Sequence, residues 1–147
     1  MKRDARRLLE RAWRAFLGAR MVARPGNADL VAVLAFLAME TAARALLVQH
    51  QISWSSSDDV REQFARWLAS GSAGRRTGGD ARRQRWLQWL LDAHDACIQA
   101  ELAIDSRLSD AAARTLIDRA RTMVQEIRDE LLWATTERYR LPAHDGR

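Results

Sequence analysis

The chain has 147 residues, of which 48% are hydrophobic and 29% are charged, and it contains two prolines. These values are typical of one globular domain with an ordinary core, and they exclude fibrous and fully disordered chains. Basic residues outnumber acidic ones by 24 to 19, and lysine occurs only at Lys2, so arginine carries almost all of the net charge of +5. Arginine suits phosphate and carboxylate ligands, but codon composition produces the same skew, so charge alone does not predict a nucleic-acid surface.

Cysteine and histidine usage argues against a metal site or a disulfide. Cys97 is the single cysteine, and the three histidines are scattered at positions 50, 94 and 144. We therefore expect no metal, no cofactor and a reducing, cytoplasmic location. The longest apolar run, at positions 30–39, is shorter than the roughly 20 residues that cross a bilayer, so we expect no membrane span and no membrane partner. We interpret the Arg-rich N-terminus as part of the fold.

The first two predicted elements are helices. Apolar residues recur at helical spacing over positions 3–22 and arginines line the opposite side, which predicts an amphipathic helix. Pro25, Gly26 and Asn27 indicate a turn, with Asn27 placed to cap a second helix over 28–49. That helix is apolar on nearly every side, so we expect it at the centre of the domain.

Three further helices follow. Residues 55–59, three serines and two aspartates, supply acceptors for the start of a short third helix that buries Val60, Phe64 and Trp67. Residues 70–80 contain four glycines and predict a mobile loop inside the domain. A fourth helix is expected over 82–102, and a long last helix follows a cap at Ser109 and Asp110. The inward side chains of the fourth helix are predicted to be Leu87, Leu90, Leu91, Cys97 and Ile98. Those of the last helix are predicted to form a stripe from Ala113 to Leu131.

The predicted fold class is all-α: an antiparallel bundle of about four long helices plus a shorter one, forming one domain over 1–135 with a polar tail at 136–147. Six tryptophans are available to this bundle. Trp13, Trp67 and Trp133 are predicted to lie in the core. Trp54 and Trp89 are predicted to contribute to an interface, which favours a homodimer.

The order of these elements resembles the HEPN superfamily of small helical bundles. The resemblance covers roughly residues 5–133. It rests on the basic first helix, the second-helix segment 34–47, Gln51 with Ile52 before the Ser/Asp-capped third helix, and segment 100–109 before the Ala-rich last helix. It implies a dimer that acts as a metal-independent RNase, as a partner of a small nucleotidyltransferase, or within a toxin–antitoxin or defence system.

The RNase signature of that superfamily is an arginine followed after four to six residues by a histidine. His94 stands where the resemblance places the histidine of this signature, but Gln88 and Trp89 occupy the positions where the arginine belongs. The spacing also occurs from Arg44 to His50 and from Arg138 to His144, where the abundance of arginine makes chance matches expected. The sequence therefore predicts a catalytically degenerate domain that binds a protein partner, such as a nucleotidyltransferase or an antitoxin-like chain, or RNA. The alternatives are an active RNase and a helical protein–protein scaffold.

Glu40 and Arg44 are one helical turn apart inside the apolar second helix, so they are placed to pair. One interpretation is a structural ion pair. The other is a polar pocket at a dimer seam or ligand cleft, with His50 at the end of the same helix as a further member. For His50 the alternative is a histidine held by the dipole of the helix C-terminus. Replacing Glu40 by glutamine would impair function without unfolding the protein if the pocket interpretation holds.

Two other groups are candidates for chemistry or binding. His94 and Glu101 lie on one side of the fourth helix and are candidates for acid–base catalysis, with Arg44 supplied by another helix or subunit; a histidine packed in the core or an interface is the alternative. The basic run before and within that helix borders Trp89 and predicts phosphate contacts with base stacking; a solvated basic loop is the alternative. The arginines of this run are Arg75, Arg76, Arg82, Arg83 and Arg85.

Overall fold

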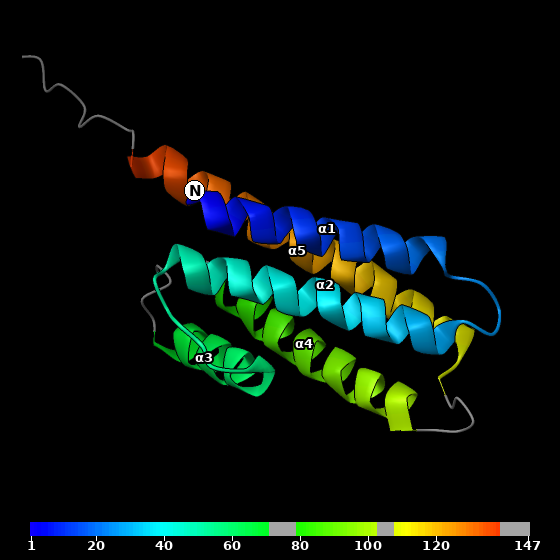
Figure 1. The fold of residues 1–147 in the computed structure, drawn as a ribbon. Helices are drawn as coiled ribbons and strands as arrows, with labels where there is room; N and C mark the ends of the chain where they lie inside the picture. The colour runs from blue at the N-terminus through cyan, green and yellow to red at the C-terminus, as the bar shows by residue number, and fades with distance from the viewer. Residues whose placement is uncertain (71–78, 103–107, 139–147) are drawn as a thin grey trace, which may run out of the picture.

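The described residues form five α-helices. The computed structural model describes residues 1–70, 79–102 and 108–138, of which 79–80 and 134–138 are described by their backbone alone. Within these ranges no β-strand occurs, and the all-α class is confirmed (Figure 1). The helices are α1 (Arg3–Met21), α2 (Ala28–Gln49), α3 (Ser57–Ala69), α4 (Gly79–Leu102) and α5 (Asp110–Arg138).

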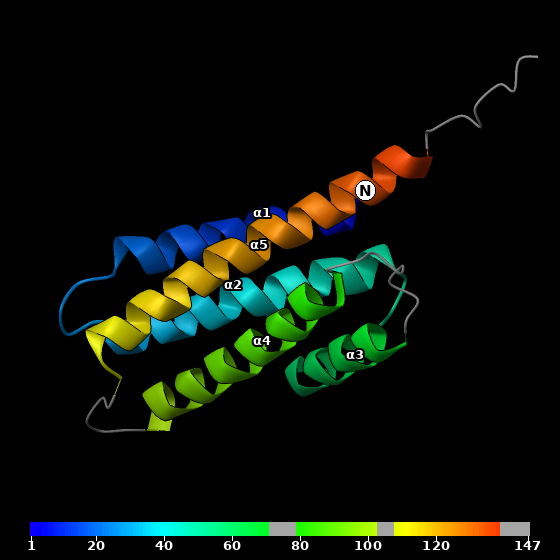
Figure 2. The same cartoon turned by 180° about the vertical axis from the view of Figure 1, so that it is seen from behind.

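The predicted central position of the second helix is confirmed. α2 contacts all four other helices, with α1 and α5 on one side and α3 and α4 on the other. Figure 2 shows from behind that α5 runs along α1 and α2. Alanine has a small side chain, so an alanine-rich surface lets neighbouring helices approach closely. The buried surface of α2 includes Ala32, Ala35, Ala38, Ala42, Ala43 and Ala45.

α2 is also the one helix of the described residues that is long and apolar enough to cross a membrane by length and composition. The prediction of no membrane span rested on the uninterrupted apolar run at 30–39, whereas α2 as a whole passes this test despite Glu40 and Arg44. In the structure, 67% of the most apolar window of α2 is buried inside the bundle. Such burial fits the core helix of a soluble protein, because its apolar side chains already have protein neighbours.

Both ends of α2 are closed by backbone geometry more than by the predicted side-chain cap. Asn27 occupies the N-cap position, but its amide nitrogen donates to the Val22 carbonyl at 3.0 Å and not to the helix. At the other end Gln51 has a φ of 59°, in the left-handed region. The amide of Ile52 donates to the Leu47 carbonyl at 2.9 Å, which is the six-to-one bond of a Schellman motif. This motif turns the chain sharply toward α3.

The remaining helix ends differ by a few residues from the predictions. α4 begins at Gly79, ahead of the expected position 82, and α5 continues to Arg138, inside the predicted tail. Most of the predicted Gly-rich loop, at 71–78, lies outside the described residues, as do positions 139–147 of the tail.

The predicted core is partly correct. Trp67 is buried, and Trp86, which the prediction did not single out, is fully buried. Trp133 is 41% exposed, so its prediction as a core residue is wrong. The reason is helical geometry: two residues after the buried Leu131 correspond to a rotation of about 200° around the helix. Leu91 and Ile98, predicted to face inward, are also wrong, because they are 40% and 38% exposed at the margin of the buried side of α4.

Candidate functional site

A buried carboxylate lies between α2 and α3. The Glu40 side chain is only 5% exposed. Its Oε2 accepts a hydrogen bond from Arg44 Nη2 at 3.2 Å, and its Oε1 accepts one from Arg61 Nη1 at 3.2 Å. The Ser57 hydroxyl also donates to Oε1. Two guanidinium groups and a hydroxyl thus compensate one buried carboxylate, and the predicted pairing of Glu40 with Arg44 is confirmed.

Arg61 is the member of this cluster that sequence reasoning missed. Its side chain is 10% exposed, donates to Ser57 Oγ at 3.2 Å and pairs with Asp58. Its guanidinium carbon also lies 5.8 Å from the centre of the Phe36 ring, within range of a cation–π contact. A signal was present: Arg61 follows Ser57 by four residues and Asp58 by three, the spacings that meet on one side of a helix.

The start of α3 explains why Ser57 and Asp58 are available to Arg61. The cap is Ser56, whose hydroxyl accepts from the Asp59 amide at 3.2 Å. In return Asp59 Oδ2 accepts from the Ser55 amide at 2.8 Å, and this backbone hydrogen bond holds the pKa of Asp59 below its ordinary value. Ser55, Ser56 and Asp59 therefore complete the helix start, and the two residues between them face Arg61.

Arg44 is the accessible member of the cluster. Its side chain is 29% exposed, and its guanidinium carbon lies 6.0 Å from the Trp54 ring centre. Its Nε is buried without a hydrogen-bond partner. His50 is the C-cap residue of α2, ten residues and about 15 Å after Glu40, and its ring centre lies 5.0 Å from that of Trp67. The structure therefore places Glu40 and Arg44 together and His50 elsewhere.

The predicted catalytic residues do not form one constellation in this chain. The His94 ring is half-buried, 5.3 Å from the Phe36 ring. Glu101 is exposed and receives a weak contact from Cys97 Sγ at 3.9 Å. Within the described residues no hydrogen bond or ion pair joins His94 to Glu101 or to Arg44. Glu101 follows His94 by seven residues, about 10 Å along α4, which explains their separation.

Cys97 is expected to react slowly with thiol reagents. Burial raises the pKa of its thiol, and the neighbouring charges of Glu101 and Glu40 raise it further, so the reactive thiolate is scarce near neutral pH. We expect a disulfide reagent such as DTNB to modify the folded protein several-fold more slowly than the denatured protein at pH 8. The Glu101→Gln variant should react faster than the parent protein. Equal rates for folded and denatured protein would contradict the expected environment.

The described arginines of the basic run join α4 to α5. Glu126 of α5 accepts from Arg85 Nη2 at 2.7 Å and from the Trp86 indole nitrogen at 2.9 Å. Arg82 Nε is 3.7 Å from the same carboxylate. Arg83 pairs with Glu130 and lies 5.5 Å from the Trp67 ring centre. Carboxylates of α5 thus offset these positive charges.

Trp89, the residue predicted to stack on bases, already contacts side chains of the protein itself. Trp89 is half-buried between two guanidinium groups, those of Arg85 at 4.7 Å and Arg119 at 5.8 Å from its ring centre. Arg75 and Arg76 lie outside the described residues. Nucleic-acid binding by this run therefore stays a prediction, and the contacts show in addition a role in holding two helices together.

An apolar face surrounds His94. We use this name for Leu30 and Leu37 of α2 with Leu91 and Ile98 of α4, which are 38–48% exposed. Leu91 and Ile98 lie one turn on either side of His94, and the Phe36–His94 contact joins the segments of α2 and α4 that carry the four side chains. In Figures 1 and 2, α3 lies along only the half of the bundle where α2 ends. The N-terminal half of α2 and the C-terminal half of α4 extend beyond it.

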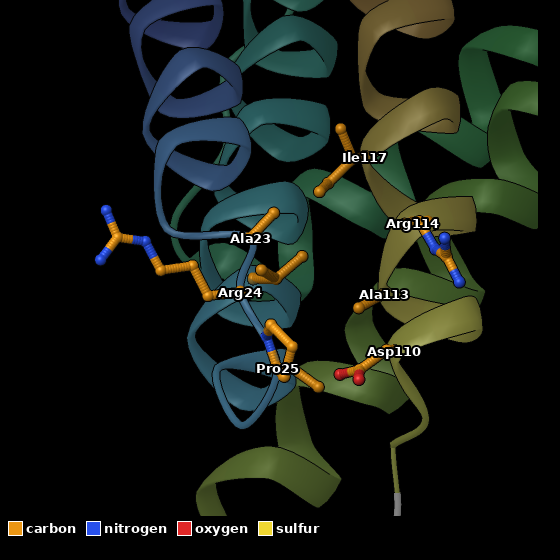
Figure 3. Close-up of a pocket in the computed structure, with 9 residues that line it drawn as sticks. Ala23, Arg24, Pro25, Asp110, Ala113, Arg114 and Ile117 are labelled. Carbon is orange, nitrogen blue, oxygen red and sulfur yellow. The ribbon is translucent and has the colours of Figure 1, made fainter.

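A small cavity of about 260 Å³ lies where the turn between α1 and α2 meets the start of α5 (Figure 3). Its lining includes the apolar side chains of Val31, Ala113 and Ile117. Asp110 points toward Pro25, whereas Arg24 extends away from the cavity. The cavity brings no set of reactive groups together.

No group of three or more histidine, cysteine, aspartate or glutamate side chains in the described ranges is arranged to hold a metal ion. Comparisons with protein-family models, with curated proteins and with solved structures give no significant match. The resemblance to the HEPN superfamily stays a prediction.

Proposed function

We propose that this chain is a HEPN-like helical binding protein that acts in the cytoplasm as a homodimer and lacks RNase activity. The observation that carries the proposal is the apolar face, with four large aliphatic side chains 38–48% exposed on two neighbouring helices. Exposed apolar side chains that gather on one surface are typical of interaction sites, because covering them removes apolar area from water. A second copy of the chain is the proposed partner at this face.

The surroundings of His94 support binding over catalysis. A general acid–base pair must reach the same substrate atoms, within about 3 Å of each. His94 packs on Phe36, Glu101 contacts Cys97, and the Arg44 guanidinium is bonded to Glu40. No hydrogen bond or ion pair joins any two of these three side chains, so the described residues supply no preorganised acid–base pair.

Within a toxin–antitoxin, nucleotidyltransferase-associated or defence system, such a dimer would hold a partner protein or RNA. The exposed side chains of the apolar face favour a protein partner over RNA, since apolar area contributes little to phosphate recognition. Neighbouring genes and co-purification from the native host would identify the partner.

Oligomeric state tests the proposal. Light scattering after size-exclusion chromatography is expected to give a dimer for the parent protein and a monomer for Leu37→Glu and Ile98→Glu, because each places a charge in the interface. Leu132→Glu is the matched control: Leu132 is 46% exposed on α5, away from the apolar face, and its variant should remain dimeric. A parent protein that is monomeric at every concentration tested would overturn the homodimer.

Incubation with total RNA, with and without EDTA, separates binding from cleavage. We expect no cleavage above background by the parent protein or by His94→Ala. Cleavage by the parent protein that persists in EDTA and disappears in His94→Ala would instead establish the RNase alternative, with an arginine such as Arg44 supplied across the dimer.

A further inference from the structure

A second apolar surface lies on the other side of the bundle, between α1 and α5. Here the two helices leave a groove of about 490 Å³ near the N-terminus of α1 and the C-terminal part of α5. Apolar side chains form much of its lining: Leu9 and Trp13 from α1, with Val124 and Leu132 from α5. Leu132 remains 46% exposed and Trp13 is half-buried, so the groove offers apolar area that the fold itself does not cover.

The rim of this groove is basic. Arg6 and Arg14 of α1 and Arg128 of α5 line it, against one acidic side chain, Glu10. Within the described residues Arg6 and Arg14 make no ion pair, and Arg128 has only an exposed contact of 3.5 Å with Asp129. This differs from the arginines of α4, whose charges are offset by Glu126 and Glu130 of α5. Positive side chains therefore outnumber negative ones along the lining of this groove.

We propose that this groove binds an acidic amphipathic helix of a partner protein. An apolar stripe on that helix would occupy the surface formed by Leu9, Trp13, Val124 and Leu132, and acidic residues beside the stripe would pair with the rim. Arg6 and Arg14 are eight residues apart, about 12 Å along α1, slightly more than two turns of a bound helix. Anchors at positions i, i+3 or i+4, and i+7 fit such a span.

Charge complementarity selects this occupant over two others. A second copy of the chain seated symmetrically in the groove would bring the rim arginines close to their own copies, which costs energy. The chain's own residues 139–147 include Arg140 and Arg147 against Asp145 alone, so they carry the wrong sign. The inference does not depend on the proposed dimer, which uses a different surface.

A designed peptide tests the groove directly. The probe is a labelled peptide of about 14 residues with leucines at i, i+3 and i+7 and glutamates on both flanks; its partner probe has lysines in place of the glutamates. Fluorescence anisotropy with the full chain is expected to show binding of the acidic probe at least about tenfold tighter than that of the lysine probe, and weaker binding as salt rises.

Variants locate the site. Arg6→Glu/Arg14→Glu and, separately, Leu132→Glu should each weaken binding of the acidic probe by about tenfold or more. Arg24→Glu/Arg114→Glu changes the charge equally at the far end of this helix pair, in the turn after α1 and near the start of α5, and should retain most of the binding. Leu37→Glu should also retain it, which separates this groove from the apolar face. Circular dichroism checks that each variant is folded.

Three results would overturn the inference. The first is equal affinity for the acidic and lysine probes. The second is an equal loss of binding in both double-arginine variants, which would indicate general charge attraction. The third is binding to vesicles of phosphatidylglycerol and phosphatidylcholine that Arg6→Glu/Arg14→Glu abolishes, without binding of the acidic probe. That last result would assign the groove to a lipid surface.

Discussion

Replacing Glu40 by alanine is expected to lower the free energy of unfolding by about 3–5 kcal/mol, because the change removes the carboxylate shared by the buried guanidinium of Arg61 and the partly exposed guanidinium of Arg44. Glu40→Gln keeps an acceptor oxygen but removes the charge, and we expect it to cost about 1.5–3 kcal/mol. Urea denaturation followed by circular dichroism measures both effects.

Glu62→Gln is the matched control for Glu40→Gln. Glu62 pairs with Arg66 at 2.7 Å, but the two side chains are 58% and 67% exposed. Exposed pairs contribute little, so this variant should change stability by less than about 1 kcal/mol. A different result would favour the polar-pocket interpretation of Glu40. In that case Glu40→Gln would be as stable as the parent protein but would no longer form the dimer or bind its ligand, and the ion pair would be dispensable to the fold.

The fold class could be predicted because helical periodicity and breakers are local signals. The turn at positions 25–27 and the caps at 55–59 and 109–110 place helix ends within a few residues of those observed. The apolar character of α2 on nearly every side also predicts its central position, since a helix packed among others can bury most of its surface.

The polar cluster was only half predictable. Glu40 and Arg44 belong to one helix, so their spacing alone predicts their pairing. Arg61 reaches Glu40 from another helix, and its distance depends on how α3 packs against α2. The same limit applies to the basic run: its hydrogen-bonded ion pairs with Glu126 and Glu130 span 41 and 47 residues of sequence and require the packing of α4 on α5. A pattern within one segment predicts neither contact.

Trp86→Ala is expected to lower the free energy of unfolding by about 3–5 kcal/mol, the range for deletion of a large aromatic side chain from a core. Trp86 is fully buried, and its indole nitrogen donates to Glu126 Oε2 at 2.9 Å, so the variant loses both packing and a charge-assisted hydrogen bond. Trp86→Phe keeps most of the apolar area, and the loss of its hydrogen bond should cost about 1.5–3 kcal/mol.

Trp133→Ala is the control that distinguishes the structure from the sequence prediction. Trp133 was predicted in the core, yet it is 41% exposed, so its removal should cost clearly less than that of the fully buried Trp86. Thermal and urea unfolding of the three variants give the comparison. A larger loss for Trp133→Ala than for Trp86→Ala would mean that α5 is rotated relative to the arrangement described. In that case the pairing of Glu126 with Arg85 and Trp86, on the same helix, would also be wrong.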